Sequence, residues 1–180
     1  MDIKKIVDKM NIDELCSQVL AHDIQNKDTN VETKTVIDKD NPGALYVSQV
    51  EYRTIRELGD KAKSDKEWRD YATKKSGYPT LMTTDAEYGP GSFSKPLPEM
   101  PNPMAWGACN DEKLIESAGE LTGRILRKYG INHILAPVVD LNINFENPLV
   151  GIRSISDDPN RVIRIAGAYI RGVQKNGYVG

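Results

Sequence analysis

The sequence predicts an α/β fold with a parallel sheet, organised as a partial (β/α)8 TIM barrel. Short apolar runs alternate with amphipathic helical segments, the pattern of successive β/α units. One apolar run, residues 133–141, is nearly continuous, as expected of a strand covered on both faces. Two strand-to-helix connections are long and rich in Gly and Pro while helix-to-strand connections are short, and a barrel builds its site from the strand-to-helix loops. A complete barrel needs ~250 residues, so we expect roughly the first three to four units here.

Residues 1–42 are expected to form a helical lead-in and a loop. Two short helices are predicted over residues 3–20, and the second begins with an Asn-x-x-Glu capping box. Residues 22–42 are polar and end in an Asn-Pro-Gly turn, which favours a loop. The chain is therefore divided into residues 1–42 and residues 43–180, the second part being the first half of a barrel that is truncated.

The first barrel unit is predicted to start at a strand over residues 43–48, an apolar run bounded by Pro-Gly. A helical segment over residues 49–75 follows, with a break expected near Gly59 or at residues 64–65. The next strand covers residues 80–84 and is introduced by Gly and Pro. These elements form one strand–helix–strand unit of a parallel sheet.

The clearest helix of the chain is predicted over residues 110–130, where an apolar stripe repeats at helical spacing. The many Gly and Pro residues of 86–109 predict a long loop ahead of it. After the strand at residues 133–141 come another loop and a helix with Asp158 as N-cap and a proline behind it. A fourth strand is predicted to begin at residues 178–180.

Composition and motif spacing exclude several function classes. The formal net charge of −2 gives no support for nucleic acid or an anionic membrane as partner. The two cysteines and two histidines are far apart in the sequence, so we expect no metal site, and no strand is followed by a glycine-rich nucleotide motif. No apolar run reaches the ~20 residues of a membrane span, and the charged N-terminus lacks a signal-peptide core, which predicts a cytoplasmic protein.

Three side chains are candidates for ligand binding at the carboxyl ends of the predicted strands. Asp85 and Asp140 each end a strand, so both are expected at the rim that carries the site. Arg153 lies in a loop at the same rim, and its planar guanidinium can bind hydroxyls or a carboxylate at two points. The simpler explanations are turn or capping roles for the acids and a loop-bracing ion pair for Arg153, with Asp140 as one partner. Glu87 is expected to be a solvated loop acid.

Five segments carry a family resemblance. In chain order they are TTDAEYGPG, PNPMAWGACND, GINHILAPVVDLN, NPLVGIRSISDDPNRV and GAYIRGVQKNGYVG. Together they resemble the N-terminal barrel of glycoside hydrolase family 3, which includes β-glucosidases, β-xylosidases and β-N-acetylhexosaminidases. The resemblance runs from about residue 9 to the last residue, with its segments in the family's order.

The resemblance implies that Asp85 and Arg153 hydrogen-bond the terminal sugar of a substrate; Asp140 is a third candidate contact from its position alone. It implies a retaining exo-β-glycosidase that hydrolyses terminal β-linked glucose or N-acetylglucosamine, without a cofactor. In the family, the nucleophile and the general acid come from later parts of the chain. No catalytic residue is therefore expected in residues 1–180, and this fragment alone is expected to be inactive.

The partners implied are a β-linked saccharide or glycoside and the missing second half of the barrel. Self-association through exposed strand edges is the other way to cover such a sheet. A different class of function stays open beside the enzyme: a half-barrel that binds carbohydrate or another protein without catalysis. Neither interpretation includes nucleic acid or a membrane.

Overall fold

The computed structural model describes residues 3–24, 30–47 and 54–177. Within them, one sheet contains four parallel strands in the order β1-β2-β3-β4. The strands are β1 (Ala21–Asp23), β2 (Ala44–Tyr46), β3 (Leu81–Thr84) and β4 (His133–Ile134). Spatial order that follows chain order, with helices in the connections, is the arrangement of a (β/α)8 barrel. The predicted α/β class with a parallel sheet is confirmed.

The first β/α unit lies where a loop was expected. Residues 22–42 contain most of β1 and all of α3 (Asn30–Asp40), so the loop prediction is wrong there. β1 is only three residues long, and two of them, His22 and Asp23, are polar. The apolar face of α3 is narrow, but it places Ile37 in the core with no exposed surface. Both elements form because the sheet and the core stabilise them, which a local pattern does not reveal.

Two short helices open the chain. They are α1 (Ile3–Val7) and α2 (Ile12–Gln18). The predicted capping box is confirmed, because the Glu14 amide donates to Asn11 Oδ1 and the Asn11 amide donates to Glu14 Oε2, both at 2.9 Å. The end of α2 packs against the amino end of β2, where the Gly43 amide donates to the Ser17 carbonyl at 3.0 Å.

α4 (Ile55–Ser76) is one uninterrupted helix, so the break predicted near Gly59 or at residues 64–65 is wrong. The buried carboxylate of Asp65 forms an ion pair with Lys61, one turn earlier on the same helix. This pairing satisfies the acid whose position suggested an interruption. The helix ends at Gly77, whose φ of 76° is left-handed.

Residues 86–109 hold two short helices where a loop was predicted. They are α5 (Pro90–Phe93) and α6 (Pro103–Cys109). Each has a proline at its first position, where the ring fixes a helical φ and no amide hydrogen is needed. Proline disrupts the interior of a helix but suits its start, and the loop prediction is wrong for these two segments.

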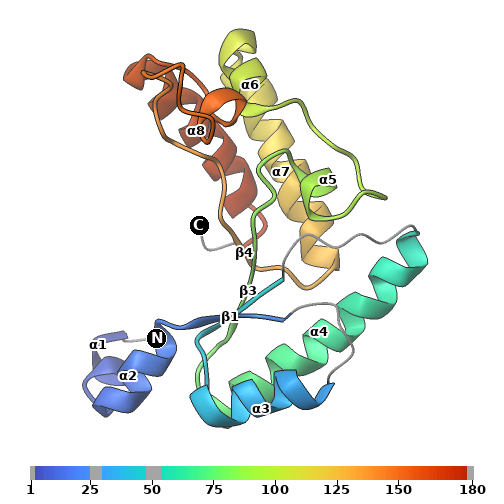
Figure 1. Cartoon of the computed structure of the whole chain (residues 1–180), viewed down its shortest axis with the longest axis vertical. Coiled ribbons are helices and arrows are strands. Elements are labelled where there is room, and N and C mark those ends of the chain that lie inside the picture. Colours follow the sequence, from blue (N-terminus) through green and yellow to red (C-terminus); the bar gives the residue numbers. More distant parts are fainter. Residues whose placement is uncertain (1–2, 25–29, 48–53, 178–180) are drawn as a thin grey trace.

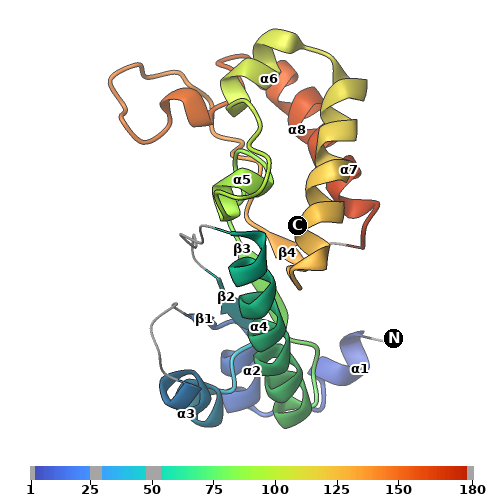
Figure 2. The ribbon, with the colours of Figure 1, turned by 90° about the vertical axis from the view of Figure 1, so that its right-hand side faces the viewer.

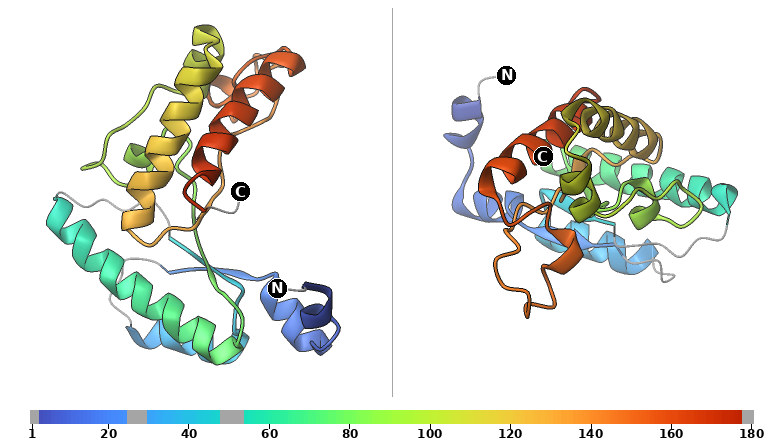
Figure 3. Two further views of the ribbon diagram at one scale, coloured as in Figure 1. Left: turned by 180° about the vertical axis from the view of Figure 1, so that it is seen from behind. Right: turned by 90° about the horizontal axis from the view of Figure 1, so that it is seen from above.

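Two long helices confirm the segments predicted around residues 110–130 and after Asp158. They are α7 (Glu112–Lys128) and α8 (Pro159–Gln174). Figure 3 shows them side by side, and their backbones approach closely. A Cβ atom on Gly119 of α7 would lie 2.3 Å from the carbonyl oxygen of Tyr169 on α8. Small side chains at this contact therefore fix how near the two helices lie.

β4 is shorter than the strand predicted over residues 133–141. The Leu135 amide donates to the Thr84 carbonyl at 2.8 Å, and β3 ends there. The chain then leaves the sheet and reaches a single 3-10 turn, η1 (Gly151–Arg153), through a segment that projects from the body of the protein in Figure 2. The strand predicted at residues 178–180 lies outside the described residues.

The two faces of the sheet have different surroundings. In Figure 1 the strands lie between the α3–α4 pair and the α7–α8 pair. Leu45, Met82 and Ile134 point to one face and are buried in the core. The alternate residues point to the other face, which we call the inner face, and line an open hollow of about 390 Å³. Its lining residues from the strands are Ala21, Asp23, Ala44, Tyr46, Leu81, Thr83 and His133, and Leu135 follows directly after β4.

Candidate functional site

Acidic and phenolic side chains gather where three neighbouring strands end. Asp23 ends β1, Tyr46 ends β2, and Asp85 follows the last residue of β3. The parallel register pairs Asp23 with Tyr46 and Tyr46 with Thr83, so these strand ends lie at one rim of the sheet. Asp85 is thus at the carboxyl-end rim, as the sequence predicts, and it has neighbours there that were not predicted.

Tyr46 and Asp85 form a hydrogen bond across this rim. The Tyr46 hydroxyl donates to Asp85 Oδ2 at 2.5 Å, and both side chains are half-buried. Burial raises the pKa of the Tyr46 phenol, and the adjacent Asp85 carboxylate raises it further, with smaller contributions from the carboxylates of Asp23 and Glu87. The phenol therefore remains protonated around neutral pH and acts as a hydrogen-bond donor.

Arg153 is held by Glu87 through two parallel hydrogen bonds. Its Nε donates to Glu87 Oε2 at 2.7 Å and its Nη2 donates to Oε1 at 2.5 Å, while Nη1 donates to the Leu149 carbonyl at 2.8 Å. The Glu87 carboxylate is the main reason why the pKa of Arg153 is raised, so the guanidinium stays charged. Among the described residues these bonds use three of its five N–H groups.

This ion pair differs from the one considered from the sequence. Within the described residues, Arg153 pairs with Glu87 and not with Asp140. Asp140 is exposed, and its backbone carbonyl accepts a hydrogen bond of 2.6 Å from the Ser154 hydroxyl. Asp140 thus anchors the segment next to Arg153 through its main chain. Glu87 is also not a solvated loop acid, because only 15% of its side-chain surface is exposed.

A tight turn after β3 carries Glu87. The Gly89 amide donates to the Ala86 carbonyl at 3.1 Å, and Ala86 and Gly89 both have positive φ angles, of 57° and 74°. A Cβ atom on Gly89 would lie 2.7 Å from the Met100 side chain, and the left-handed φ is the stronger reason for glycine here. The turn thus separates two acids with different partners, since Asp85 binds Tyr46 and Glu87 binds Arg153.

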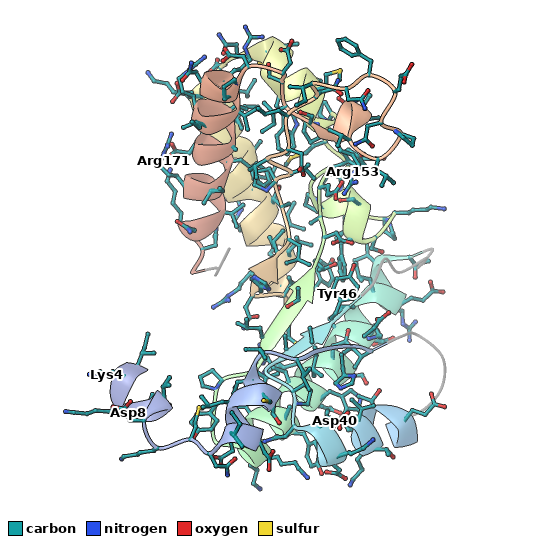
Figure 4. The ribbon with its side chains drawn as sticks, turned by 60° about the vertical axis from the view of Figure 1, so that its left-hand side comes forward. Lys4, Asp8, Asp40, Tyr46, Arg153 and Arg171 are labelled. Atoms are coloured by element: carbon teal, nitrogen blue, oxygen red, sulfur yellow. The ribbon has the colours of Figure 1, made fainter. Side chains whose placement is uncertain are left out.

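Figure 4 shows Tyr46 at the strands and Arg153, the last residue of η1, beyond their ends. The Asp85 carboxylate raises the pKa of Tyr46 through its hydrogen bond and, as the smallest of several contributions, that of Arg153 by charge alone. Asp23, Asp85 and Glu87 together with Arg153 carry a formal net charge of −2, from three acids and one guanidinium. Carboxylate acceptors and a fixed guanidinium donor within one rim suit an uncharged ligand with several hydroxyl groups.

Below the rim, the inner face carries a second polar pair. Thr83 Oγ1 and His133 Nδ1 lie 3.0 Å apart, and burial lowers the pKa of His133, so its ring is neutral at pH 7.

No group of three or more His, Cys, Asp or Glu side chains in the described part of the chain could hold a metal ion. None of the helices described there is both long and apolar enough to cross a membrane.

The sequence could have identified two of the residues that it missed. Glu87 belongs to the same short motif as Asp85, and Tyr46 lies in a predicted strand at a position that alternation assigns to one face. Asp23 had no such signal, because β1 was not recognised as a strand. Arg153 and Glu87 are 66 residues apart in the chain, and no sequence pattern links them.

Residues 10–180 match the family model of the glycosyl hydrolase family 3 N terminal domain. One relative is a beta-N-acetylglucosaminidase/beta-glucosidase of Cellulomonas fimi, 28% identical over 99 residues, which are 55% of this chain and 18% of that protein. Another is a beta-hexosaminidase of Photobacterium profundum, 26% identical over 160 residues, which are 88% of this chain and 45% of that protein. The chain thus spans less than half the length of these two relatives.

Solved structures resemble the whole chain. A beta-glucoside phosphorylase BglX bound to 2FGlc superposes with a TM-score of 0.80 at 27% identity, over 98% of this chain and 30% of that one. A beta-N-acetylhexosaminidase from Beutenbergia cavernae gives a TM-score of 0.78 at 22% identity, over 94% and 52%, which is a likeness of fold. The four-stranded sheet therefore corresponds to part of such a barrel, and the protein described here belongs to glycosyl hydrolase family 3.

Proposed function

We propose that this chain forms the sugar-binding part of a retaining exo-β-glycosidase that hydrolyses terminal β-linked glucose or N-acetylglucosamine. Membership of family 3 supports a glycoside substrate, and relatives named for both sugars support both possibilities. The observation that carries the proposal is the pair of fixed groups at the rim: the Asp85 carboxylate bound by Tyr46, and the Arg153 guanidinium bound by Glu87, two residues after Asp85 in the chain.

A sugar hydroxyl donates one hydrogen bond and accepts others, so a neighbouring acceptor and donor can hold one or two adjacent hydroxyls. In this proposal Asp85 accepts from the terminal sugar, and Arg153 donates to it through the N–H groups that Glu87 and Leu149 leave available. Asp140, which is exposed and lies six residues beyond the end of β4 and not at the strand end expected from the sequence, is proposed as a weaker contact. The charge on each group makes these bonds stronger than bonds between neutral partners.

The proposed reaction takes its nucleophile and its acid/base from outside residues 1–180. A retaining glycosidase needs two carboxyl groups about 5–5.5 Å apart, one as nucleophile and one as proton donor. Asp85 already accepts from Tyr46, and Glu87 is bound to Arg153, so both act best as fixed carboxylates. No cofactor is needed, because water and two carboxyl groups suffice for the hydrolysis.

The open inner face of the sheet suggests what kind of partner covers it. Four strands present the hollow of about 390 Å³, which is open on one side. We propose the second half of a barrel as its cover, either on a longer polypeptide or on a separate one; association of two copies is the alternative. The same open face is also compatible with the second candidate function, a non-catalytic half-barrel that binds carbohydrate or a protein.

Sugar binding by the rim is tested with Asp85→Ala and Arg153→Ala in the full polypeptide that carries this chain. Because each change removes a hydrogen bond to a charged group, the affinity for methyl β-glucoside or methyl β-N-acetylglucosaminide should fall about 10- to 100-fold. The measurements are calorimetric binding and hydrolysis of aryl β-glycosides. Asp60→Ala and Arg164→Ala are the matched controls, since both residues lie on the outer helices.

Wild-type affinity in both rim variants would refute a sugar site at this rim. Hydrolysis by wild-type protein with weakened binding in the rim variants supports the enzyme. Sugar binding that depends on the rim, with no hydrolysis even after the covering half is supplied, supports the non-catalytic alternative.

A further inference from the structure

Tyr46 occupies a position that neither the family resemblance nor the sequence pattern singled out. Its side chain lies on the inner face, at the end of β2, between the strands that carry Asp23 and Asp85. Its hydroxyl group could serve either acid, but its hydrogen bond goes to Asp85, at 2.5 Å. The phenol is thus attached to the one carboxylate that the proposed function assigns to the sugar.

The bond also decides which part of Asp85 is available. Tyr46 binds Oδ2, and within the described residues no other hydrogen bond to the Asp85 side chain is formed. The carboxylate has two oxygens and can accept about four hydrogen bonds, so Oδ1 stays available to a ligand. A carboxylate held through one oxygen cannot rotate freely, and its second oxygen then keeps a defined direction.

The hydrogen bond from Tyr46 also supplies Asp85 with a donor in a negatively charged environment. Asp23 and Glu87 contribute negative charge at Tyr46 together with Asp85, so the rim acids repel one another. Arg153 is already engaged by two hydrogen bonds to Glu87. A phenol supplies Asp85 with a donor without adding a second positive charge, and it cannot transfer its proton readily because its pKa is raised.

We propose that Tyr46 is a positioning residue, which holds the Asp85 carboxylate through Oδ2 so that Oδ1 faces the terminal sugar. The proposal rests on the proposed function, since it assigns Asp85 to the sugar. Its physical content is preorganisation: the sugar meets an acceptor that is already oriented, and binding does not have to restrict the Asp85 side chain.

The test is Tyr46→Phe in the full polypeptide that carries this chain, with methyl β-glucoside and methyl β-N-acetylglucosaminide as ligands. Removing the hydroxyl should weaken sugar binding about tenfold, as expected for one hydrogen bond to a charged group. Tyr71→Phe is the matched control. Tyr71 also donates to an aspartate, Asp38 on α3, at 2.5 Å, but it lies on the outer helix α4. That variant should bind sugar as the wild type does.

A double-mutant cycle separates positioning from general support of the fold. If Tyr46 acts through Asp85, Tyr46→Phe should cost about tenfold in the wild-type background and nothing further in an Asp85→Ala background. Equal losses in both backgrounds, or unchanged binding by Tyr46→Phe while Asp85→Ala binds weakly, would overturn the role of Tyr46. Unchanged binding by Asp85→Ala and Arg153→Ala would instead remove the proposed function.

A second measurement keeps the hydroxyl in place, in case Tyr46→Phe does not fold. 3-Fluorotyrosine at position 46 gives a fluorine resonance next to the hydroxyl that binds Asp85. Addition of either methyl glycoside should shift this resonance, and Asp85→Ala should shift it in the free protein and abolish the response to sugar. A resonance that responds to neither change would overturn the proposal.

Discussion

The pair of Glu87 and Arg153 determines which donors the rim can offer. Two hydrogen bonds, of 2.7 and 2.5 Å, align the planar guanidinium with the carboxylate. The Arg153 side chain is 41% exposed and that of Glu87 only 15%, so the cation faces the solvent over an acid that lies beneath it. Glu87 therefore orients Arg153, in the same way that Tyr46 orients Asp85.

Glu87→Gln tests this orientation. The amide can accept at one oxygen only, so the two-point contact is lost and Arg153 becomes more mobile. Sugar affinity should fall about fivefold to tenfold, while the free energy of unfolding changes by only about 0–1 kcal/mol because the pair is partly exposed. Binding calorimetry and urea unfolding measure the two effects.

The matched control is Glu112→Gln, which breaks an exposed pair with Arg164, whose Nη1 lies 3.1 Å from Glu112 Oε1 on the outer helices. It should leave sugar affinity unchanged. Equal binding by Glu87→Gln and the wild type would show that Arg153 does not need Glu87 to meet the ligand.

At the scale of elements, α7 and α8 fit together because glycine allows a close backbone approach from both sides. Gly119 of α7 faces the Tyr169 carbonyl, and a Cβ on Gly172 of α8 would lie 2.0 Å from the Glu116 carbonyl oxygen. Trp106 of α6 stacks on Tyr169 with ring centroids 4.7 Å apart, which extends the same contact. Ion pairs such as Lys175 with Glu116, at 2.6 Å, line its exposed edge.

Two substitutions of the same kind should have opposite effects on stability. Gly119→Ala places a methyl group against a main-chain oxygen that cannot move aside, so it should lower the free energy of unfolding by about 1–3 kcal/mol. Gly59→Ala on α4 meets no atom within 4 Å. It should raise that free energy by about 0.5–1 kcal/mol, because alanine favours a helix over glycine. Urea unfolding measures both, and two changes of the same sign would contradict this account of the α7–α8 contact.

The same scale shows where sequence patterns succeed. α7 and α8 carry wide apolar stripes and a capping aspartate each, and both were predicted. α3 and β1 are short and polar, and the core decides their structure through groups such as Ile37. A proline in the sequence is compatible with either the end or the start of a helix. For α5 and α6, only the surrounding structure distinguishes the two cases.

At the scale of the molecule, the open inner face exposes apolar side chains to solvent. Val19, at the end of α2, is 83% exposed, and Leu135, beyond β4, is 49% exposed; both line the hollow. Apolar side chains of this kind on a sheet face favour association with a covering partner.

The 180-residue chain by itself should therefore associate as its concentration rises. Val19→Lys should weaken this association by placing a charge at the border of the inner face. Ile163→Lys is the matched control, because Ile163 is 70% exposed but belongs to the outer helix α8. Sedimentation velocity over a range of concentrations measures the effect. A chain that stays monomeric throughout, or equal effects of the two substitutions, would contradict a role of the inner face.

The sequence by itself determined the α/β class, the parallel sheet, the long helices, the family, and the positions of Asp85 and Arg153 near the ends of β/α units. These features depend on local periodicity, capping residues and short motifs, which neighbouring residues specify. Only the tertiary structure decided that Glu87 binds Arg153, that Tyr46 binds Asp85 and that Asp23 ends a strand. The partners in these contacts come from different β/α units, and parallel pairing of the strands brings them to one rim.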